Sequence, residues 1–139
     1  MAFDALTWLT GTATNPEEDI TATGNSAYKF VGENTAMVFE ARVMGAVTGT
    51  SPTLDMVIAA ASDAAGTGSV TIATFAQLTA THSNVVGDGT GPARVAGITP
   101  DSKGWIRLQK TIGGTSTPTF NDVTVVPIPT GAAVVNSRS

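Results

Sequence analysis

Turn signals recur along this chain at short and fairly regular intervals, and this spacing limits its possible folds more than any other feature. Segments rich in Gly, Pro, Asn, Asp and Ser lie at 10–19, 23–25, 32–34, 48–52, 64–69, 87–92, 99–104 and 113–118. The runs between them are short and rich in β-branched and aromatic residues. Frequent turns between short runs of this kind are typical of an all-β sandwich or barrel.

Most of these runs alternate between apolar and polar side chains. The predicted strands are 27–31, 36–47, 54–60, 70–78, 93–98, 105–112 and 120–128. Within 36–47, Met37 and Phe39 share a face while Glu40 and Arg42 point the other way, as in a half-buried strand. Lys110 falls on the apolar face of its run, so we expect it near a strand end where its ammonium reaches water.

These runs predict a single jelly-roll-like antiparallel β-sandwich of about seven or eight strands. The length of 139 residues fits one domain with a sizeable core. We assign residues 20–128 to the sandwich, 1–19 to an N-terminal arm and 129–139 to a C-terminal tail. Pro127 and Pro129 are expected to stop any central strand near the end of the chain.

Composition excludes several classes of function. Hydrophobic residues make up 42% of the chain and charged residues only 13%, so contact with other subunits is favoured over a free monomer. The net charge of −4 and the few Lys and Arg residues argue against binding nucleic acid. There is no Cys, no secretory leader and no apolar run long enough to span a membrane, so we expect synthesis in a cytoplasm.

The segment 54–68, LDMVIAAASDAAGTG, could be read as a helix or as a site where Asp55 and Asp63 act together. Its alternation of side chains favours a strand at 54–60, followed by a turn that Gly66 ends. On a strand and a turn the two carboxylates are too far apart to work as a catalytic pair. Asp63 is better explained as a turn residue that accepts hydrogen bonds from its own backbone.

Other candidate sites are weak. His82 with Ser83 and Asp88 could form a hydrolytic triad, but no nucleophile elbow accompanies them, so a polar loop histidine is favoured. The glycines of 87–92 lack the Lys of a phosphate-binding loop. Glu17, Glu18 and Asp19 could bind calcium, although adjacent side chains diverge in an extended segment and a solvated acidic bend is favoured. We therefore predict no enzyme activity, no metal and no cofactor.

The aromatic residues Trp8, Trp105, Tyr28 and the phenylalanines raise the alternative of a sugar-binding platform. Packing in a core or an interface is the more frequent role of aromatic residues in sandwiches. Trp105 begins a predicted strand near Lys103 and Arg107, on the face opposite the aliphatic side chains. It is therefore the aromatic residue that we expect to be exposed and to contact a partner.

The order of strands and turns resembles the small capsid cement (decoration) proteins of tailed bacteriophages, in particular the jelly-roll type of a Bordetella podophage. The resemblance covers about residues 50–127. It depends on an alternating strand that runs into the turn Ser62-Asp63-Ala64-Ala65, and on the strand Trp105-Ile106-Arg107-Leu108 that ends at Gly113-Gly114.

This resemblance implies a structural, non-enzymatic virion protein on the outer surface of an icosahedral head. Such a protein bridges neighbouring major capsid proteins, resists internal DNA pressure and associates with copies of itself as dimers or trimers on symmetry axes. The hypothesised contact residues are Phe3, Leu6 and Trp8 in the N-terminal arm, together with Trp105 and Arg107 on the sandwich.

Three alternatives stay open. The chain could be another virion component, such as a head–tail joining or minor tail protein, which copy number per particle would separate from cement. It could be a carbohydrate- or receptor-binding module, which requires a cluster of exposed aromatic residues. It could be a hydrolase that uses His82 and Ser83, in which case His82→Ala should abolish turnover.

Overall fold

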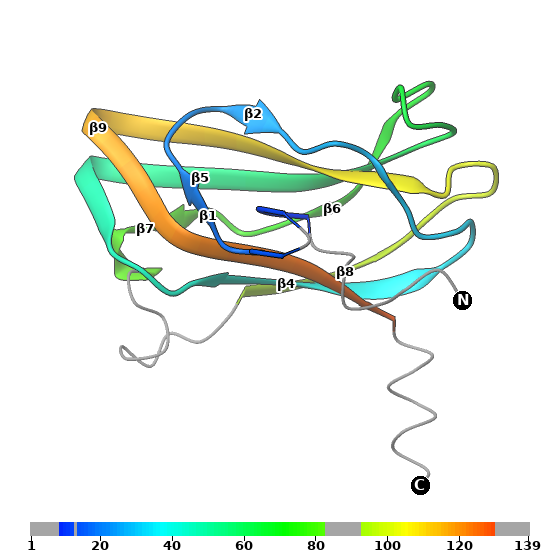
Figure 1. The fold of residues 1–139 in the computed structure, drawn as a ribbon, viewed down its shortest axis with the longest axis horizontal. Coiled ribbons are helices and arrows are strands. Elements are labelled where there is room, and N and C mark those ends of the chain that lie inside the picture. The colour runs from blue at the N-terminus through cyan, green and yellow to red at the C-terminus, as the bar shows by residue number, and fades with distance from the viewer. Residues whose placement is uncertain (1–8, 13, 83–92, 130–139) are drawn as a thin grey trace, which may run out of the picture.

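The computed structural model describes residues 9–12, 14–82 and 93–129. In these ranges the chain is all-β and antiparallel, and it forms a single jelly-roll-like sandwich that is nearly closed into a barrel (Figure 1). This confirms the predicted fold class. The elements are β1 (Glu18–Ile20), β2 (Gly24–Asn25), β3 (Lys29–Phe30), β4 (Ala36–Val43), β5 (Val47–Ala61), β6 (Val70–Thr74), β7 (Leu78–Thr79), the 3-10 turn η1 (Ala80–His82), β8 (Ala93–Ile98) and β9 (Trp105–Pro129).

The sandwich is built from one long two-stranded ribbon. Residues 36–61 pair antiparallel with residues 129–105 in nearly constant register: Met37 pairs with Pro129, Val47 with Phe120 and Ala61 with Trp105. Figure 1 shows the ribbon folding over at one end, so that β9 runs through both layers. The first layer contains β6, β5 and residues 105–112 of β9, and the second contains β8, β4 and residues 123–129 of β9.

The corner where the ribbon folds over contains the segments 48–52 and 113–118, which the sequence predicts to be turns that end strands. That prediction is wrong, because β5 and β9 continue through both segments with shifts of register between Thr48 and Thr53. The bend is made instead by residues with positive φ inside the strands. They are Gly49, Ser51, Gly114, Ser116, Thr117 and, just beyond, Asp122. Bulges and left-handed residues bend a strand without ending its pairing.

Pro127 and Pro129 were expected to stop the strand, and that prediction is wrong. β9 pairs with β4 as far as Pro129. The directions of the backbone groups explain why. Val125 donates its N–H to Thr10 Oγ1 and accepts from Leu9 N, so its polar groups point away from β4. Residues two and four positions later point to the same side, where their missing N–H groups are not needed for the β4 ladder.

The core lies between the two layers and is formed by the inward side chains of the ribbon. The largest of the fully buried residues are Phe39, Phe120, Leu9, Ile20, Met37, Leu54, Met56, Ile58, Ile106 and Leu108. At the open side of the sandwich β8 approaches β6, and a Cβ on Gly97 would lie 3.0 Å from the carbonyl oxygen of Ile72. A glycine at this position therefore lets the two edges come close together.

The segment from Leu9 to Val31 follows the free edge of β9 across both layers. The Leu9 N–H donates to the carbonyl of Val125. Further along the segment, Glu18 pairs with Val123, Gly24 with Lys110 and Lys29 with Ile106. Leu9 and Thr10, which belong to the predicted arm, are both buried against the sandwich. Residues 1–8 of that arm and 130–139 of the tail lie outside the described residues.

Lys110 is not near a strand end, and that prediction is wrong. It lies inside β9, which runs from Trp105 to Pro129. It is only 8% exposed, with its side chain toward the core. Its ammonium forms an ion pair with Glu18 Oε2 from β1. Glu18 Oε1 also accepts a hydrogen bond from Gly11 N, 3.1 Å away. A buried ammonium is tolerated because the edge segment supplies a carboxylate as its partner.

Candidate interaction surfaces

The two contact residues predicted on the sandwich, Trp105 and Arg107, lie on the outer face of the first layer. Their neighbours on the same strand, Ile106 and Leu108, are fully buried, so alternation directs Trp105 and Arg107 outward. The Phe30 ring of β3 packs edge-on against Trp105, with ring centroids 5.5 Å apart and an interplanar angle of 62°. This T-shaped geometry is a favourable one for two aromatic rings.

Arg107 stacks on the next ring of the same face. Its guanidinium carbon lies 4.6 Å from the centroid of the Tyr28 ring, a cation–π contact. Arg107 Nε and Tyr28 Oη are both buried without a hydrogen-bond partner. A Cβ on Gly66 would lie 2.9 Å from the Tyr28 ring, so the loop after β5 also packs closely against this tyrosine. We call Tyr28, Phe30, Trp105 and Arg107 the aromatic shelf.

The exposure of these rings differs from expectation in one respect. Trp105 is half-buried, and Phe30, at 50%, is the most exposed aromatic side chain among the described residues. Sequence reasoning did not single out Phe30 as a contact residue, because the predicted strand at 27–31 is too short for its alternation to show which face is exposed. The other three predicted contact residues, Phe3, Leu6 and Trp8, lie outside the described residues.

The shelf has a poor geometry for the sugar-platform alternative. Its Trp105 and Phe30 rings meet at a steep angle, so the two cannot both lie flat against one sugar ring. Tyr28 is buried beneath Arg107 and beside Gly66. A surface of Trp, Tyr, Phe and Arg side chains instead has the composition of a protein–protein hot spot.

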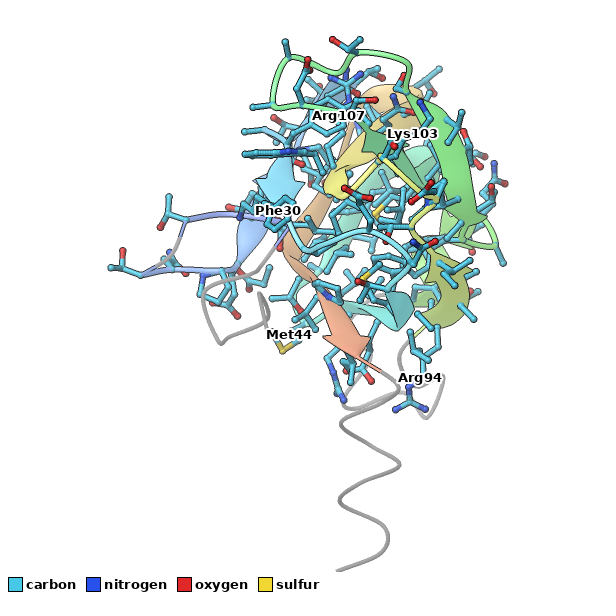
Figure 2. All side chains as sticks on the ribbon, turned by 90° about the vertical axis from the view of Figure 1, so that its right-hand side faces the viewer. Phe30, Met44, Arg94, Lys103 and Arg107 are labelled. Carbon is cyan, nitrogen blue, oxygen red and sulfur yellow. The ribbon has the colours of Figure 1, made fainter. Side chains whose placement is uncertain are left out.

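A second apolar surface covers the outer face of the other layer. Paired positions of β8, β4 and β9 bring together Ala36, Val38, Ala96, Ile98, Val126 and Ile128. We call these six residues the apolar strip. Ile98 is 56% exposed, and Ile128 is also exposed. Arg94, on β8 of this layer, projects outward on the side of the molecule opposite Arg107, as Figure 2 shows. No local sequence pattern indicates the strip, because its residues come from three separate strands.

An ionic cluster lies at one end of the apolar strip. The Glu40 carboxylate accepts hydrogen bonds from two guanidinium groups. Arg42 Nε lies 2.9 Å from Glu40 Oε1, and Arg94 Nε lies 2.9 Å from Glu40 Oε2. Burial by itself would raise the pKa of Glu40, but the hydrogen bonds and charges of the two guanidinium groups outweigh it and hold the pKa below its ordinary value. The carboxylate therefore stays ionised, and the cluster has one net positive charge.

The loop after β5 confirms the predicted strand and turn at 54–68. Asp63 Oδ1 accepts from Ala65 N at 3.0 Å and from Thr67 N at 3.1 Å, while Oδ2 accepts from the Thr67 hydroxyl at 2.7 Å. Gly66 closes the turn with φ near 88°. The bonds from Thr67, and then those from the Ala65 and Gly66 amides, hold the pKa of Asp63 below its ordinary value.

Asp63 is therefore expected to titrate below the ordinary aspartate value of about 3.9. Because the pKa is lower in the folded loop, the ionised carboxylate stabilises the turn above the unfolded-state pKa, and this contribution is lost as the pH falls through the folded-state pKa. Carboxyl NMR shifts measured against pH will show the midpoint. Thr67→Val removes the hydroxyl donor and should raise the pKa of Asp63. If Asp63 in the native chain titrates at the ordinary aspartate value, these hydrogen bonds do not lower its pKa.

The remaining candidate residues are not brought together. Asp55 lies on β5, eight residues before Asp63, and its carboxylate accepts hydrogen bonds from Gln77 Nε2 at 3.1–3.2 Å. His82 Nδ1 accepts from Thr79 N at 3.0 Å, which gives the ring a structural role at η1. Ser83, Asp88 and the glycine segment 87–92 lie outside the described residues.

The three acidic residues at 17–19 diverge, as expected for an extended segment. Glu18 pairs with Lys110, Asp19 Oδ1 accepts from Asp122 N at 3.0 Å, and Glu17 is exposed. Within the described ranges, no group of three or more His, Asp or Glu side chains is placed to hold a metal ion. No helix in those ranges is long and apolar enough to cross a membrane.

Comparison of the chain with protein-family models, with curated proteins and with solved structures gave no match.

Proposed function

We propose that the chain is a structural, non-enzymatic subunit that binds the outer surface of a phage head and cements neighbouring major capsid proteins. The observation that carries this proposal is the pair of contact surfaces, the aromatic shelf and the apolar strip, on opposite outer faces of one sandwich. A subunit that bridges two neighbours needs at least two such surfaces. The family resemblance stated above supports the same role.

The aromatic shelf is the surface that we assign to the major capsid protein. Trp, Tyr and Arg are the residues most enriched where protein interfaces gain most of their binding free energy. Phe30 adds exposed apolar area beside Trp105, and the Arg107 guanidinium is already held in place by Tyr28. Preorganised side chains lose less conformational entropy when a partner binds.

The low content of charged residues also supports a role in a large assembly. With 13% charged residues, the surface has little charge to repel neighbouring subunits. Each contact can then be small, because hundreds of copies on one particle add their contributions. A head–tail joining or minor tail protein would be present in far fewer copies, so quantitative mass spectrometry of purified particles separates these roles.

The proposal is tested by co-sedimentation with expanded heads of the phage that encodes the chain. Phe30→Ser and Trp105→Ala are each expected to weaken head binding about tenfold or more, since both remove shelf area. Thr111→Ala, an exposed position on the same face of β9, is the matched control and should bind normally. Folding of each variant is checked by circular dichroism. Unchanged binding by both shelf variants would exclude the shelf as the capsid contact.

The N-terminal hypothesis has its own variant. Deletion of residues 1–8 removes Phe3, Leu6 and Trp8 but keeps Leu9, whose side chain is part of the core. If the three residues anchor the subunit, the shortened chain should keep its folded spectrum and sediment less with heads. Undiminished sedimentation would refute the anchor.

A further inference from the structure

We propose that residues 1–8, which we call the N-terminal octet, cover the apolar strip in the free subunit. The occupant of the strip is then a segment of the same chain, which joins the described part of the sandwich at Leu9. The biological purpose rests on the proposed function: a covered strip keeps subunits apart until a head is present, and release of the octet on the head frees both. The cover is measured on the purified subunit without heads, so its failure and the failure of capsid binding are separate results.

An uncovered strip is unfavourable for this chain in solution. Ile98 is 56% exposed and Ile128 is 38% exposed, and Ala36 and Ala96 are exposed beside them. Adjoining apolar side chains on one face favour unspecific association. Charged residues make up only 13% of the chain, so charge repulsion does little to oppose it. A segment that shields this face therefore benefits the free subunit.

The position of Leu9 directs the preceding residue to the outer face of the second layer. Leu9 donates its N–H to Val125 O at 2.9 Å, and its side chain is 1% exposed in the core. In an extended chain the residue before a core-facing one points the opposite way, which here is outward. The octet therefore enters the outer face with the ring of Trp8 beside β9.

The exposure of the outward positions on β9 changes along this face. Thr124 lies between two core residues, so it points outward, yet it is only 5% exposed. The outer face is therefore already covered at the level of Leu9. Two positions further along β9, Val126 is half-buried, and after two more Ile128 is exposed. The strip thus begins where this cover ends, beside the point from which the octet continues.

The octet is long enough to cross the strip. Leu9 lies level with Ala41 of β4, and the far corner of the strip, at Ile98, lies level with Ala36 of the same strand. With about 3.3 Å per residue and about 4.8 Å between strands, this corner is roughly 22 Å from Leu9. Eight extended residues span about 26 Å. The octet can therefore reach every part of the strip.

The octet also has the composition of a cover for an apolar face. Phe3, Leu6 and Trp8 are large apolar side chains, and Asp4 is the one charged side chain in the segment. The tail at 130–139 also follows the strip in sequence, but its apolar side chains are Ala and Val alone. Larger side chains bury more apolar area for each residue that is ordered, so the octet is favoured over the tail.

The test uses Trp8 as a probe of its own surroundings. The chain has two tryptophans, so Trp105→Phe leaves Trp8 as the single fluorophore, and quenching by acrylamide reports how far its ring is covered. In the folded chain we expect quenching about threefold weaker than in the same chain unfolded in urea, because the ring packs on the strip. Val38→Ser and Ile98→Ser in this background should each raise quenching of the folded chain about twofold, since each removes apolar area from the contact.

Val57→Ser is the matched control, because Val57 lies on the outer face of the other layer and its loss should leave the quenching unchanged. Circular dichroism and the urea midpoint show that each variant is folded. Quenching of the folded chain as strong as in urea, or quenching that neither strip variant changes, would overturn the proposal. Protection that grows with protein concentration would show that a second copy supplies the cover and would also overturn it.

Discussion

Replacing Glu18 by Ala is expected to lower the free energy of unfolding by about 2–4 kcal/mol, an unusually large effect for a residue near the surface. The reason is Lys110, whose ammonium would be left in the sandwich interior with only 8% of the residue exposed. An unpaired buried charge must be neutralised or must reach water, and either change disturbs the packing around β9. Urea unfolding followed by tryptophan fluorescence will measure the loss.

Lys110→Met gives the matching control for the ion pair. A methionine fills similar volume without a charge, and the partly exposed Glu18 carboxylate then gains water, so stability should stay within about 1 kcal/mol of the native value. The double variant should resemble Lys110→Met alone. Equal losses for Glu18→Ala and Lys110→Met would show that the pair itself, and not the unpaired ammonium, determines the stability.

Gly49→Ala is expected to destabilise the sandwich by about 2–4 kcal/mol, because two penalties coincide at the corner of the ribbon. The residue has φ near 101°, a conformation that side chains rarely adopt. A Cβ there would also lie 2.6 Å from Pro118 Cα on the paired strand. The two strands would have to separate where the ribbon folds over. A thermal midpoint lower by roughly 10 °C is the expected reading.

Gly24→Ala is the control for that substitution. Gly24 lies on β2, and a Cβ there would meet nothing within 4 Å. Alanine should therefore be neutral or stabilise by about 0.4–1 kcal/mol, because it restricts the unfolded chain. If Gly49→Ala were as mild as Gly24→Ala, the corner would be able to relax, and its positive φ would not be needed for the bend.

Much of the architecture could be predicted from the sequence because alternation is a local property. The strand at 93–98 agrees with β8, and 54–60 lies within β5. The segments 48–52 and 113–118 were wrongly predicted to end strands, because the same Gly, Ser, Thr and Pro residues can either end a strand or bend it. Their partners lie 60 or more residues away, and pairing at that distance leaves no local signal.

The candidate surfaces were less predictable, for the same reason. Trp105 and Arg107 could be placed outward from the alternation of one strand, but Tyr28 and Phe30 join them only through the pairing of β3 with β9. The apolar strip needs three strands in register before its residues become neighbours. The burial of Lys110 likewise depends on Glu18, which is 92 positions earlier in the chain.

The single ribbon also determines the order in which the chain can acquire its structure. β9 is the direct partner of β1, β2, β3, β4 and β5, so none of these strands has its principal neighbour until residues 105–129 have left the ribosome. Closing the loop from Ala61 to Trp105 is the shortest way to start the ribbon, and every later pair adds to an existing ladder. With almost all pairing between distant residues, slow folding is expected for this topology. Until β9 pairs, the apolar faces of the earlier strands are open to neighbouring chains.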